Sequence, residues 1–413
     1  GSYLQSVVPS AEAFTVRMHH SFIQLPEPGF QPRVFDPRSS FIPLTYVDYT
    51  TPVAEPIQQY YAIRHRLQKK DPSAPVSDPV HQIIYYLDRG TPEPIRSALL
   101  EGASWWNQAF EAAGYRNAFQ VALLPDSADP MDIRYNVINW VHRSTRGWSY
   151  GASVVDPRTG EIIKGQVTLG SLRVRQDYLI AQGLLAALRD TLPQPDPMLT
   201  LALSRLKQLA AHEVGHTLGL MHNYASSARN RSSVMDYPHP WVRLTGNQSI
   251  TTDSAYDDKI GVWDKVAIRW GYQDFPSGVD PSAALRQILT EAIREGLLFI
   301  SDRDARAPGG LHPQAHLWDN GSDPVAELKN VMQVRAKALQ QFGTNNIRSG
   351  TPMAFLEDVL VPIYFYHRYQ LEAVTKQIGG MSYTYALKGD EQEITQPVSR
   401  ARQRDALNAV LDC

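Results

Sequence analysis

Cysteine is almost absent from this sequence, which contains a single one, Cys413, at its last position. One thiol cannot form an internal disulfide, so the fold has no disulfide framework. A single cysteine also excludes a zinc site closed by several thiolates, which is a common form of structural zinc site. Any zinc site in this chain therefore has to use other ligands.

Strong net charge and long apolar runs are missing as well. The formal net charge is −2 at pH 7, which gives no electrostatic reason to expect nucleic acid or an anionic membrane as a partner. No apolar run approaches the roughly 20 residues of a transmembrane helix, so we expect no membrane span. With 413 residues, 43% of them hydrophobic and 20% charged, the chain is typical of a globular protein with two or three domains.

The most informative stretch is HEVGHTLGLMHN at residues 212–223. His212 and His216 are four positions apart, so an α-helix places both imidazoles on one face, one turn apart. Gly219 can adopt a positive φ, which ends the helix and turns the chain back. His222 then supplies a third nitrogen. Three neutral imidazoles with an open fourth position form the ligand set of a catalytic zinc site.

Glu213 directly follows the first histidine and projects beside the predicted metal. A carboxylate in that place can take a proton from metal-bound water, whose pKa zinc lowers towards neutrality. Glu213 is therefore the predicted general base, and it can return the proton to the leaving group. The residues alone predict metal-assisted hydrolysis of a carbonyl compound, either an amide or an ester.

The longer pattern HExxHxxGxxH resembles the signature of the metzincin clan of zinc metallopeptidases. A second clan element follows at residues 233–237, where SVMDY resembles the Met-turn. By this resemblance Met235 forms an apolar floor beneath the metal and is not a ligand. The segments DPRTGEI and AHLWDNGSDPVAEL are similar to those of a group of large bacterial zinc-dependent metzincins. The resemblance implies one catalytic Zn²⁺, a protein or peptide substrate, and a secreted or periplasmic location.

Tyr237 stands two positions after Met235, where astacins and serralysins carry a tyrosine near zinc. The resemblance implies that its hydroxyl approaches the metal and then stabilises the tetrahedral oxyanion. The alternative is a tyrosine that lines the wall of a substrate pocket. Asn223, after the third histidine, departs from the glutamate of astacins, the proline of serralysins and the usual serine of matrix metalloproteinases.

A turn signal, DPRTG at residues 156–160, separates two apolar runs at 150–155 and 162–169, which predicts a β-hairpin. In metzincins the strand before such a turn is the exposed edge above the cleft. The resemblance therefore implies that this strand pairs with extended peptide substrate; without it, the segment is a plain hairpin. The substrate-binding residues implied are Gly151, Ala152 and Ser153.

The apolar pattern predicts an α+β fold with three parts. Residues 1–80 form a β-rich N-terminal segment. The metzincin resemblance implies that residues 81–272 form a metzincin-like catalytic domain with a twisted mixed sheet, an active-site helix and the Met-turn. Residues 273–413 form a mainly helical region packed on that domain. We expect strands at residues 13–25, 41–49, 82–87, 119–124 and 133–141, and helices at 91–113, near 177–190, after Asp196-Pro197, at 254–272, and starting at Pro281 and Pro324.

A long irregular segment at residues 304–323 is rich in glycine and polar groups, and such loops are often functional. We expect this segment to pack against the catalytic domain. Asp and Asn most often make turns and helix caps, which is the alternative to metal binding for these residues. The candidate ligands in it are His312 and His316 for a second metal, and Asp319, Asn320 and Asp323 for a structural Ca²⁺.

The leading functional hypothesis is a zinc-dependent endopeptidase that acts as a monomer. One alternative is an amidase or exopeptidase on small peptides. A further alternative is a non-catalytic binding module on the same fold. Such modules usually lose the glutamate or a histidine, and neither is lost here.

Overall fold

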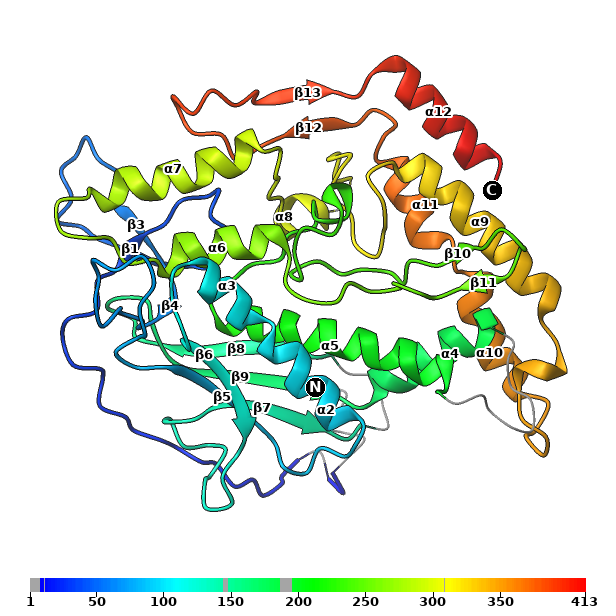
Figure 1. Ribbon diagram of the computed structural model, residues 1–413, viewed down its shortest axis with the longest axis horizontal. Helices are drawn as coiled ribbons and strands as arrows, with labels where there is room; N and C mark the ends of the chain where they lie inside the picture. The colour runs from blue at the N-terminus through cyan, green and yellow to red at the C-terminus, as the bar shows by residue number, and fades with distance from the viewer. Residues whose placement is uncertain (1–7, 11, 144–147, 186–194, 308) are drawn as a thin grey trace.

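A computed structural model describes residues 8–10, 12–143, 148–185, 195–307 and 309–413. At its centre these residues form a six-stranded sheet in the order β4-β9-β7-β5-β6, with β8 paired to β9 (Figure 1). All its pairings are parallel except that of β8, which runs antiparallel to β9. The strands are β4 (Arg64–His65), β5 (Ile83–Leu87), β6 (Phe119–Leu123), β7 (Asn136–Val141), β8 (Tyr150–Val155) and β9 (Glu161–Gly170).

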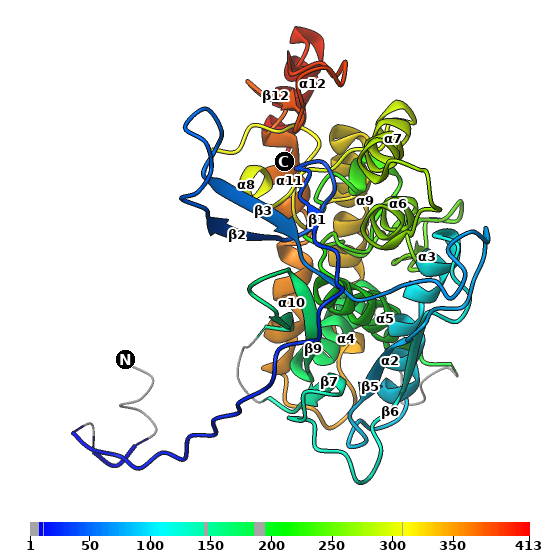
Figure 2. The same cartoon turned by 90° about the vertical axis from the view of Figure 1, so that its left-hand side faces the viewer.

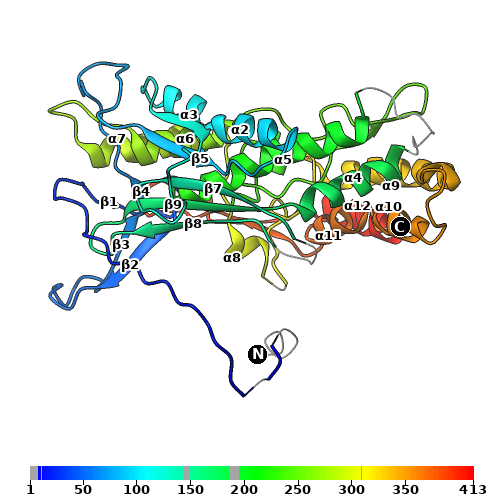
Figure 3. The same ribbon diagram turned by 90° about the horizontal axis from the view of Figure 1, so that it is seen from below.

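One face of this sheet is covered by helices, as the view from below shows (Figure 3). Parallel strands need such cover, and Ile83, Tyr85 and Leu87 of β5 are accordingly buried. Tyr85 of β5 shares one core with Trp106, Phe110 and Val214 from the helices. This core fixes the longest of them, α5, against the sheet. The covering helices are α2 (Ile95–Ser104), α3 (Trp106–Ala112), α5 (Pro197–Thr217) and α6 (Val262–Tyr272).

The C-terminal part is mainly helical. Asp280 and Asp323 cap the helices α7 and α9 by accepting backbone N–H groups, and each is followed by a proline at the first helical position. The helices α4 and α9 to α12 gather at one end of the molecule, on the right of Figure 1. The helices at this end are α4 (Leu172–Leu185), α9 (Pro324–Gln341), α10 (Phe355–Tyr364), α11 (Arg368–Thr375) and α12 (Arg400–Leu411). The other helices beyond residue 273 are α7 (Pro281–Arg294) and α8 (Asp302–Ala305), and 3-10 turns lie at Ser227–Arg229 (η1) and Thr344–Asn346 (η2).

The remaining strands form small antiparallel sheets. One lies near the N-terminus in the order β1-β3-β2, and two are paired ribbons, β10 with β11 and β12 with β13. Ahead of β1, residues 12–25 leave the body of the molecule as an extended segment (Figure 2). The strands are β1 (Arg33–Val34), β2 (Pro43–Val47), β3 (Gln58–Ala62), β10 (Arg243–Leu244), β11 (Ile250–Thr251), β12 (Met381–Tyr383) and β13 (Thr395–Pro397).

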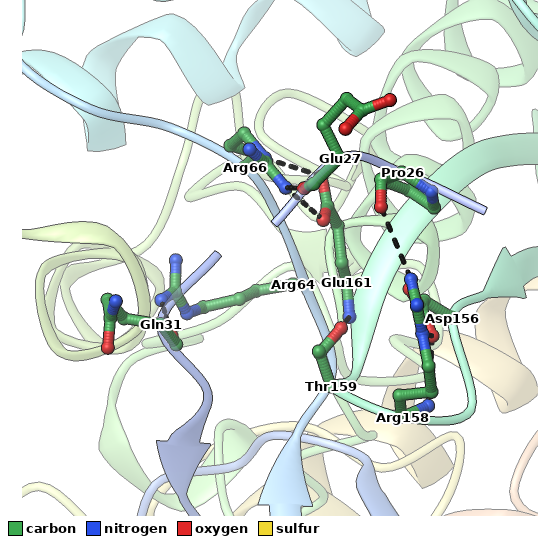
Figure 4. A network of polar contacts seen from close by, with 9 residues as sticks. All are labelled: Pro26, Glu27, Gln31, Arg64, Arg66, Asp156, Arg158, Thr159 and Glu161. Atoms are coloured by element: carbon green, nitrogen blue, oxygen red, sulfur yellow. Dashed lines mark hydrogen bonds and ion pairs between the residues drawn. The ribbon is translucent and has the colours of Figure 1, made fainter. Parts of the chain in front are cut away.

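Arginines fix the N-terminal chain at residues 26–31 to the turn that follows β8 (Figure 4). Arg158 also pairs with Asp156, and Arg66 pairs with Glu161, so both carboxylates flanking this turn are engaged. The turn is thereby tied to a segment far away in the sequence. The bonds to backbone carbonyls run from Arg158 Nη2 to Pro26 (3.2 Å), from Arg66 Nη2 to Glu27 (2.8 Å) and from Arg64 Nη2 to Gln31 (2.6 Å).

The α+β fold class is confirmed, and so is the hairpin around residues 156–160. The predicted strands at 41–49, 82–87, 119–124 and 133–141 correspond to β2, β5, β6 and β7. The helix after Asp196-Pro197 is also confirmed, because Asp196 accepts hydrogen bonds from the backbone N–H groups of Met198 and Leu199. The helix expected near 177–190 begins earlier, at Leu172, and Asp190 lies outside the described residues.

Several boundaries were predicted wrongly. Residues 13–25 form no strand, because they have no partner strand; Phe22 is 98% exposed despite its apolar character. The helix expected at 91–113 is divided into α2 and α3 at Trp105. The helix expected at 254–272 begins only at Val262, because Ser254 and Lys259 adopt positive φ angles of 63° and 96°.

The division into parts at residues 80 and 272 stays a prediction. Contacts cross both limits: β4 pairs with β9 of the six-stranded sheet, and Asn223 donates through Nδ2 to the carbonyl of Leu298. Within the part of the chain that the structure describes, no helix has the length and apolarity to cross a bilayer.

Candidate metal centre

The predicted ligands lie at the end of α5 and in the loop after it. The helix ends at Thr217, and Gly219 follows with a φ of +98°. A Cβ on Gly219 would lie 2.1 Å from the carbonyl oxygen of Ile63, so only glycine fits this turn. The turn is then held by the backbone of residues 40–42, because Met221 N donates to Ser40 O (2.8 Å) and Ile42 N donates to Gly219 O (2.8 Å).

The structure brings His212, His216 and His222 together. One nitrogen from each lies within 4.8 Å of the others, and Nε2 of His216 is 3.1 Å from Nε2 of His222. Nε2 of His212 is buried and has no hydrogen-bond partner among the described residues. A buried polar atom without a partner costs free energy unless something binds it. The donor set and this unpaired nitrogen fit a zinc ion.

Each of the three imidazoles has its other nitrogen, Nδ1, engaged. His212 bonds to the carbonyl of Val234 at 2.8 Å, and His216 bonds to the carbonyl of Leu220 at 2.8 Å. His222 bonds to Oδ2 of Asp302 at 2.6 Å. These acceptors require the proton on Nδ1, which leaves the lone pair of Nε2 free for a metal.

Burial keeps two of the imidazoles neutral. Burial, together with the neighbouring imidazoles, lowers the pKa of His212 well below its ordinary value, and burial and His222 lower that of His216 to about 4. Neutral imidazole is the form that binds a metal, since protonation would occupy the lone pair. The electrostatics therefore agree with the ligand geometry.

Glu213 is almost fully buried, between α5 and β8. Burial raises its pKa to about 8, although the charge of Arg205 and the backbone N–H of Gly151 both favour the ionised form. Gly151 lies against the helix here: a Cβ on it would be 2.2 Å from the carbonyl oxygen of Glu213. The carboxyl group is therefore in a water-poor environment, held between the helix and the predicted substrate strand.

The Met-turn lies directly beneath the helix. Met235 is 2% exposed. Its Sδ would be 2.3 Å from a Cβ on Gly215, so the methionine packs against α5 at a position where only glycine leaves room for it. Asp264, on the first turn of α6, holds the turn by accepting from Ser233 Oγ (2.6 Å) and from the backbone N–H of Val234 (2.8 Å). Met235 thus packs against the helix that carries His212 and His216, and its place beneath a bound metal stays a prediction.

Tyr237 lies beside the imidazoles. Its ring centroid is 4.7 Å from that of His222 and 5.3 Å from that of His212. Burial raises the pKa of its hydroxyl, and the charge of Glu213 contributes to the same shift. The ring of Trp318 also packs against that of Tyr237, with 5.0 Å between centroids. This position agrees with both roles expected from the sequence.

The predicted substrate strand, β8, is an edge strand: among the described residues it pairs with β9 and with no other strand. Exposure alternates along it, with Gly151 and Ser153 partly buried and Ala152 exposed. The register pairs Gly151 with Val167. The three predicted residues therefore lie on a free sheet edge next to Glu213, and their contact with substrate stays a prediction.

Segments from beyond residue 273 border the metal-binding loop. Asn223 donates through Nδ2 to the carbonyl of Leu298 (3.0 Å), and Tyr224 N donates to the carbonyl of Ile300 (2.9 Å). Sequence reasoning missed Asp302, Asp264 and Trp318. No motif signals them, although the place of Asp264 near a helix start is typical of a capping carboxylate.

Most of the candidate ligands for a second metal or calcium have other partners. Among the described residues, the three histidines are the only group of three or more His, Cys, Asp or Glu side chains placed to hold an ion. The expectations of a second metal and of calcium therefore find no support. His312 bonds to Tyr383 O (3.0 Å), Asp319 accepts from Ser227 Oγ (3.1 Å), Asn320 accepts from Arg231 (3.0 Å), and Asp323 caps α9. Both ring nitrogens of His316 are buried without a hydrogen-bond partner among the described residues, and Nε2 lies 3.4 Å from the carboxylate of Glu372.

A mixed sheet backed by an active-site helix, three converging imidazoles and a buried methionine turn define a zincin-type metal centre. A family model described as Met-zincin matches residues 194–413, more than half of the chain, so the chain belongs to this family. The metzincin resemblance of the motif is confirmed. A second model, described as a domain of unknown function, matches residues 2–70. Searches of curated proteins and of solved structures found no match.

Proposed function

We propose that this chain is a zinc-dependent endopeptidase. The observation that carries the proposal is the convergence of one nitrogen each from His212, His216 and His222, all within 4.8 Å of one another. Family membership supports a zinc-dependent peptidase-like function in general. A zinc ion held by these nitrogens would supply a Lewis acid for the scissile carbonyl and for the attacking water.

Glu213 is the proposed general base. Its carboxylate takes a proton from the attacking water and passes it to the nitrogen of the departing amine. Without a metal, burial outweighs the effects of Arg205 and Gly151 and raises the pKa of this carboxyl group to about 8. A cation at the histidines would favour the charged form and so return Glu213 to the state in which a base works.

Tyr237 is the proposed donor to the carbonyl oxygen that becomes negatively charged. Its ring packs on His222 at 4.7 Å, and the charge of Glu213 acts on its hydroxyl. Burial keeps this hydroxyl protonated, which is the form that can donate a hydrogen bond.

The free edge of β8 is the proposed place for the substrate backbone. An extended peptide can add to such an edge as a further strand, so that main-chain hydrogen bonds hold it regardless of sequence. Internal cleavage follows from this mode, because an edge strand imposes no terminus on the peptide. A secreted or periplasmic location stays a prediction from the bacterial relatives that the motifs resemble.

The test is cleavage of a reduced, unfolded protein, with the products identified by mass spectrometry. Glu213→Gln is expected to lower the rate by about 10²–10⁴-fold, because the general base is lost while the ligands stay. Zinc content should be unchanged, and a chelator should stop cleavage by the wild type. Glu111→Gln, on the exposed side of α3, is the matched control.

The alternatives give different results in the same experiment. Trimming from peptide ends, without internal cuts, would favour an exopeptidase or amidase. Zinc binding without turnover of any peptide in a diverse mixture would favour a binding module. Wild-type cleavage rates in Glu213→Gln would show that the assigned base is wrong.

A further inference from the structure

The three ligand imidazoles have Nδ1 acceptors of two kinds. Those of His212 and His216 are backbone carbonyls, whereas that of His222 is the carboxylate of Asp302, at 2.6 Å. A carboxylate is a stronger acceptor than a carbonyl because the hydrogen bond to it is charge-assisted. The third ligand thus has a support that the other two lack.

Asp302 is itself held in one orientation. While Oδ2 accepts from His222, Oδ1 accepts from the hydroxyl of Tyr224 (3.2 Å) and from Nη1 of Arg306 (3.1 Å). Both carboxylate oxygens therefore have fixed roles. The Arg306 guanidinium also balances the negative charge beside the imidazole.

The backbone that carries Asp302 is clamped to the loop that carries His222. Tyr224 N donates to the carbonyl of Ile300 (2.9 Å), and Ile300 N donates to Oδ1 of Asn223 (3.3 Å). Asp302 is the first residue of the short helix α8, two residues after Ile300. These bonds fix both ends of the contact between His222 and Asp302.

We infer that Asp302 is a positioning residue for the third zinc ligand. Its carboxylate keeps the proton of His222 on Nδ1, orients the ring and makes Nε2 more basic towards a metal. The C-terminal region therefore takes part in the metal centre, although all three ligands precede it. This inference rests on the proposed function to the extent that the histidines bind zinc.

The experiment measures the Kd for Zn²⁺ by competition with a chromophoric chelator, using the full chain. Asp302→Ala is expected to weaken zinc binding by about 10–100-fold. Asp302→Asn keeps the size and one acceptor oxygen but loses the charge, so its Kd should fall between those of wild type and Asp302→Ala. The readout needs no catalytic activity.

Asp304→Asn is the matched control on the same short helix. The carboxylate of Asp304 accepts from the hydroxyls of Tyr383 (2.9 Å) and Tyr385 (2.6 Å), so it also ties α8 to a neighbouring segment. It has no contact with the histidines in the described structure. Its variant is expected to keep the wild-type Kd.

Unfolding of the zinc-free variants separates positioning from a general structural role. A lower unfolding temperature with an unchanged Kd in both Asp302 variants would overturn the inference. If Asp302→Ala does not fold, Asp302→Asn decides in the same way. Wild-type protein that binds no zinc would overturn the proposed function and this inference together, whereas equal Kd values in wild type and variants overturn the inference alone.

Discussion

The metal-binding histidines fall into two regions that are held in place differently. His212 and His216 stand on α5, whose position is fixed by its own capping residue and by the core beneath the sheet. His222 stands in a loop that is fixed by residues 40–42 on one side and by residues 298–302 on the other. The first region is a rigid element, and the second depends on segments far away in the sequence.

The acceptors of the imidazole Nδ1 atoms show the same difference. His216 uses Leu220, four residues away, whereas His212 uses Val234 and His222 uses Asp302. The spacing of the histidines specifies which residues can bind a metal. The orientation of their rings depends on contacts between distant parts of the chain, and this is where substitutions outside the motif should act.

Removal of one ligand from each region should give the largest effect. His216→Ala and His222→Ala are both expected to weaken zinc binding by more than the about 10–100-fold expected of a supporting residue, because each removes a direct ligand. Zinc content after dialysis is the measurement, with His20→Ala, an exposed histidine, as control. Full zinc content in His222→Ala would show that the loop region contributes no ligand.

Asp264→Ala tests whether the helical region also depends on a distant support. The substitution leaves the hydroxyl of Ser233 and the backbone N–H groups of Val234 and Gly261 without their buried acceptor. The expected loss is about 2–5 kcal/mol in the free energy of unfolding, measured with urea on zinc-free protein.

Asp257→Ala is the control for Asp264→Ala, because Asp257 is an exposed residue just before the same helix. A loss below about 0.5 kcal/mol in Asp264→Ala, the range of ordinary surface substitutions, would mean that the Met-turn does not need this carboxylate.

The last expected effect concerns pH and is confined to zinc-free protein. In zinc-free protein, burial raises the pKa of Glu213 from 4.5 to about 8, so the folded state keeps a proton that the unfolded state releases between these values. The free energy of unfolding should therefore fall as pH rises through this window, with a slope of up to about 1.4 kcal/mol per pH unit. Glu213→Gln should lack this contribution.

Urea unfolding of zinc-free wild type and Glu213→Gln at pH 5 and pH 8 measures the pH effect. The wild type should lose more unfolding free energy than Glu213→Gln between pH 5 and pH 8. The stability of the variant relative to wild type should therefore be higher at pH 8 than at pH 5. Parallel pH profiles would mean that Glu213 titrates near its ordinary value. Zinc should flatten the wild-type profile, because a nearby cation favours the carboxylate.

Much of the central fold follows from local patterns. Asp196 and Pro197 mark the start of α5, the turn at residues 156–160 marks the hairpin, and short apolar runs mark β5 and β6. These predictions succeed because capping, turn geometry and side-chain alternation act between near neighbours. Helices and strands can therefore be predicted from the sequence where short-range interactions decide them.

The failed predictions share a different cause. Residues 13–25 have the composition of a strand but no partner, so composition alone does not make one. The helix expected from Ser254 starts at Val262, because Ser254 and Lys259 adopt positive φ angles and Asp264 accepts from Gly261 N at the helix start. The first outcome depends on a partner strand, and the second on the local backbone conformation.

The sequence by itself determined the chemistry of the metal centre, since the spacing of His212, His216 and His222 around a glycine turn restricts the chain to one ligand arrangement. Only the tertiary structure decided how that centre is supported. Asp302 bonds to His222, which is 80 residues away in the sequence. Asp264 bonds to the backbone of Val234, which is 30 residues away. Hydrogen bonds between distant residues have no characteristic spacing in the sequence, because their geometry exists only after folding.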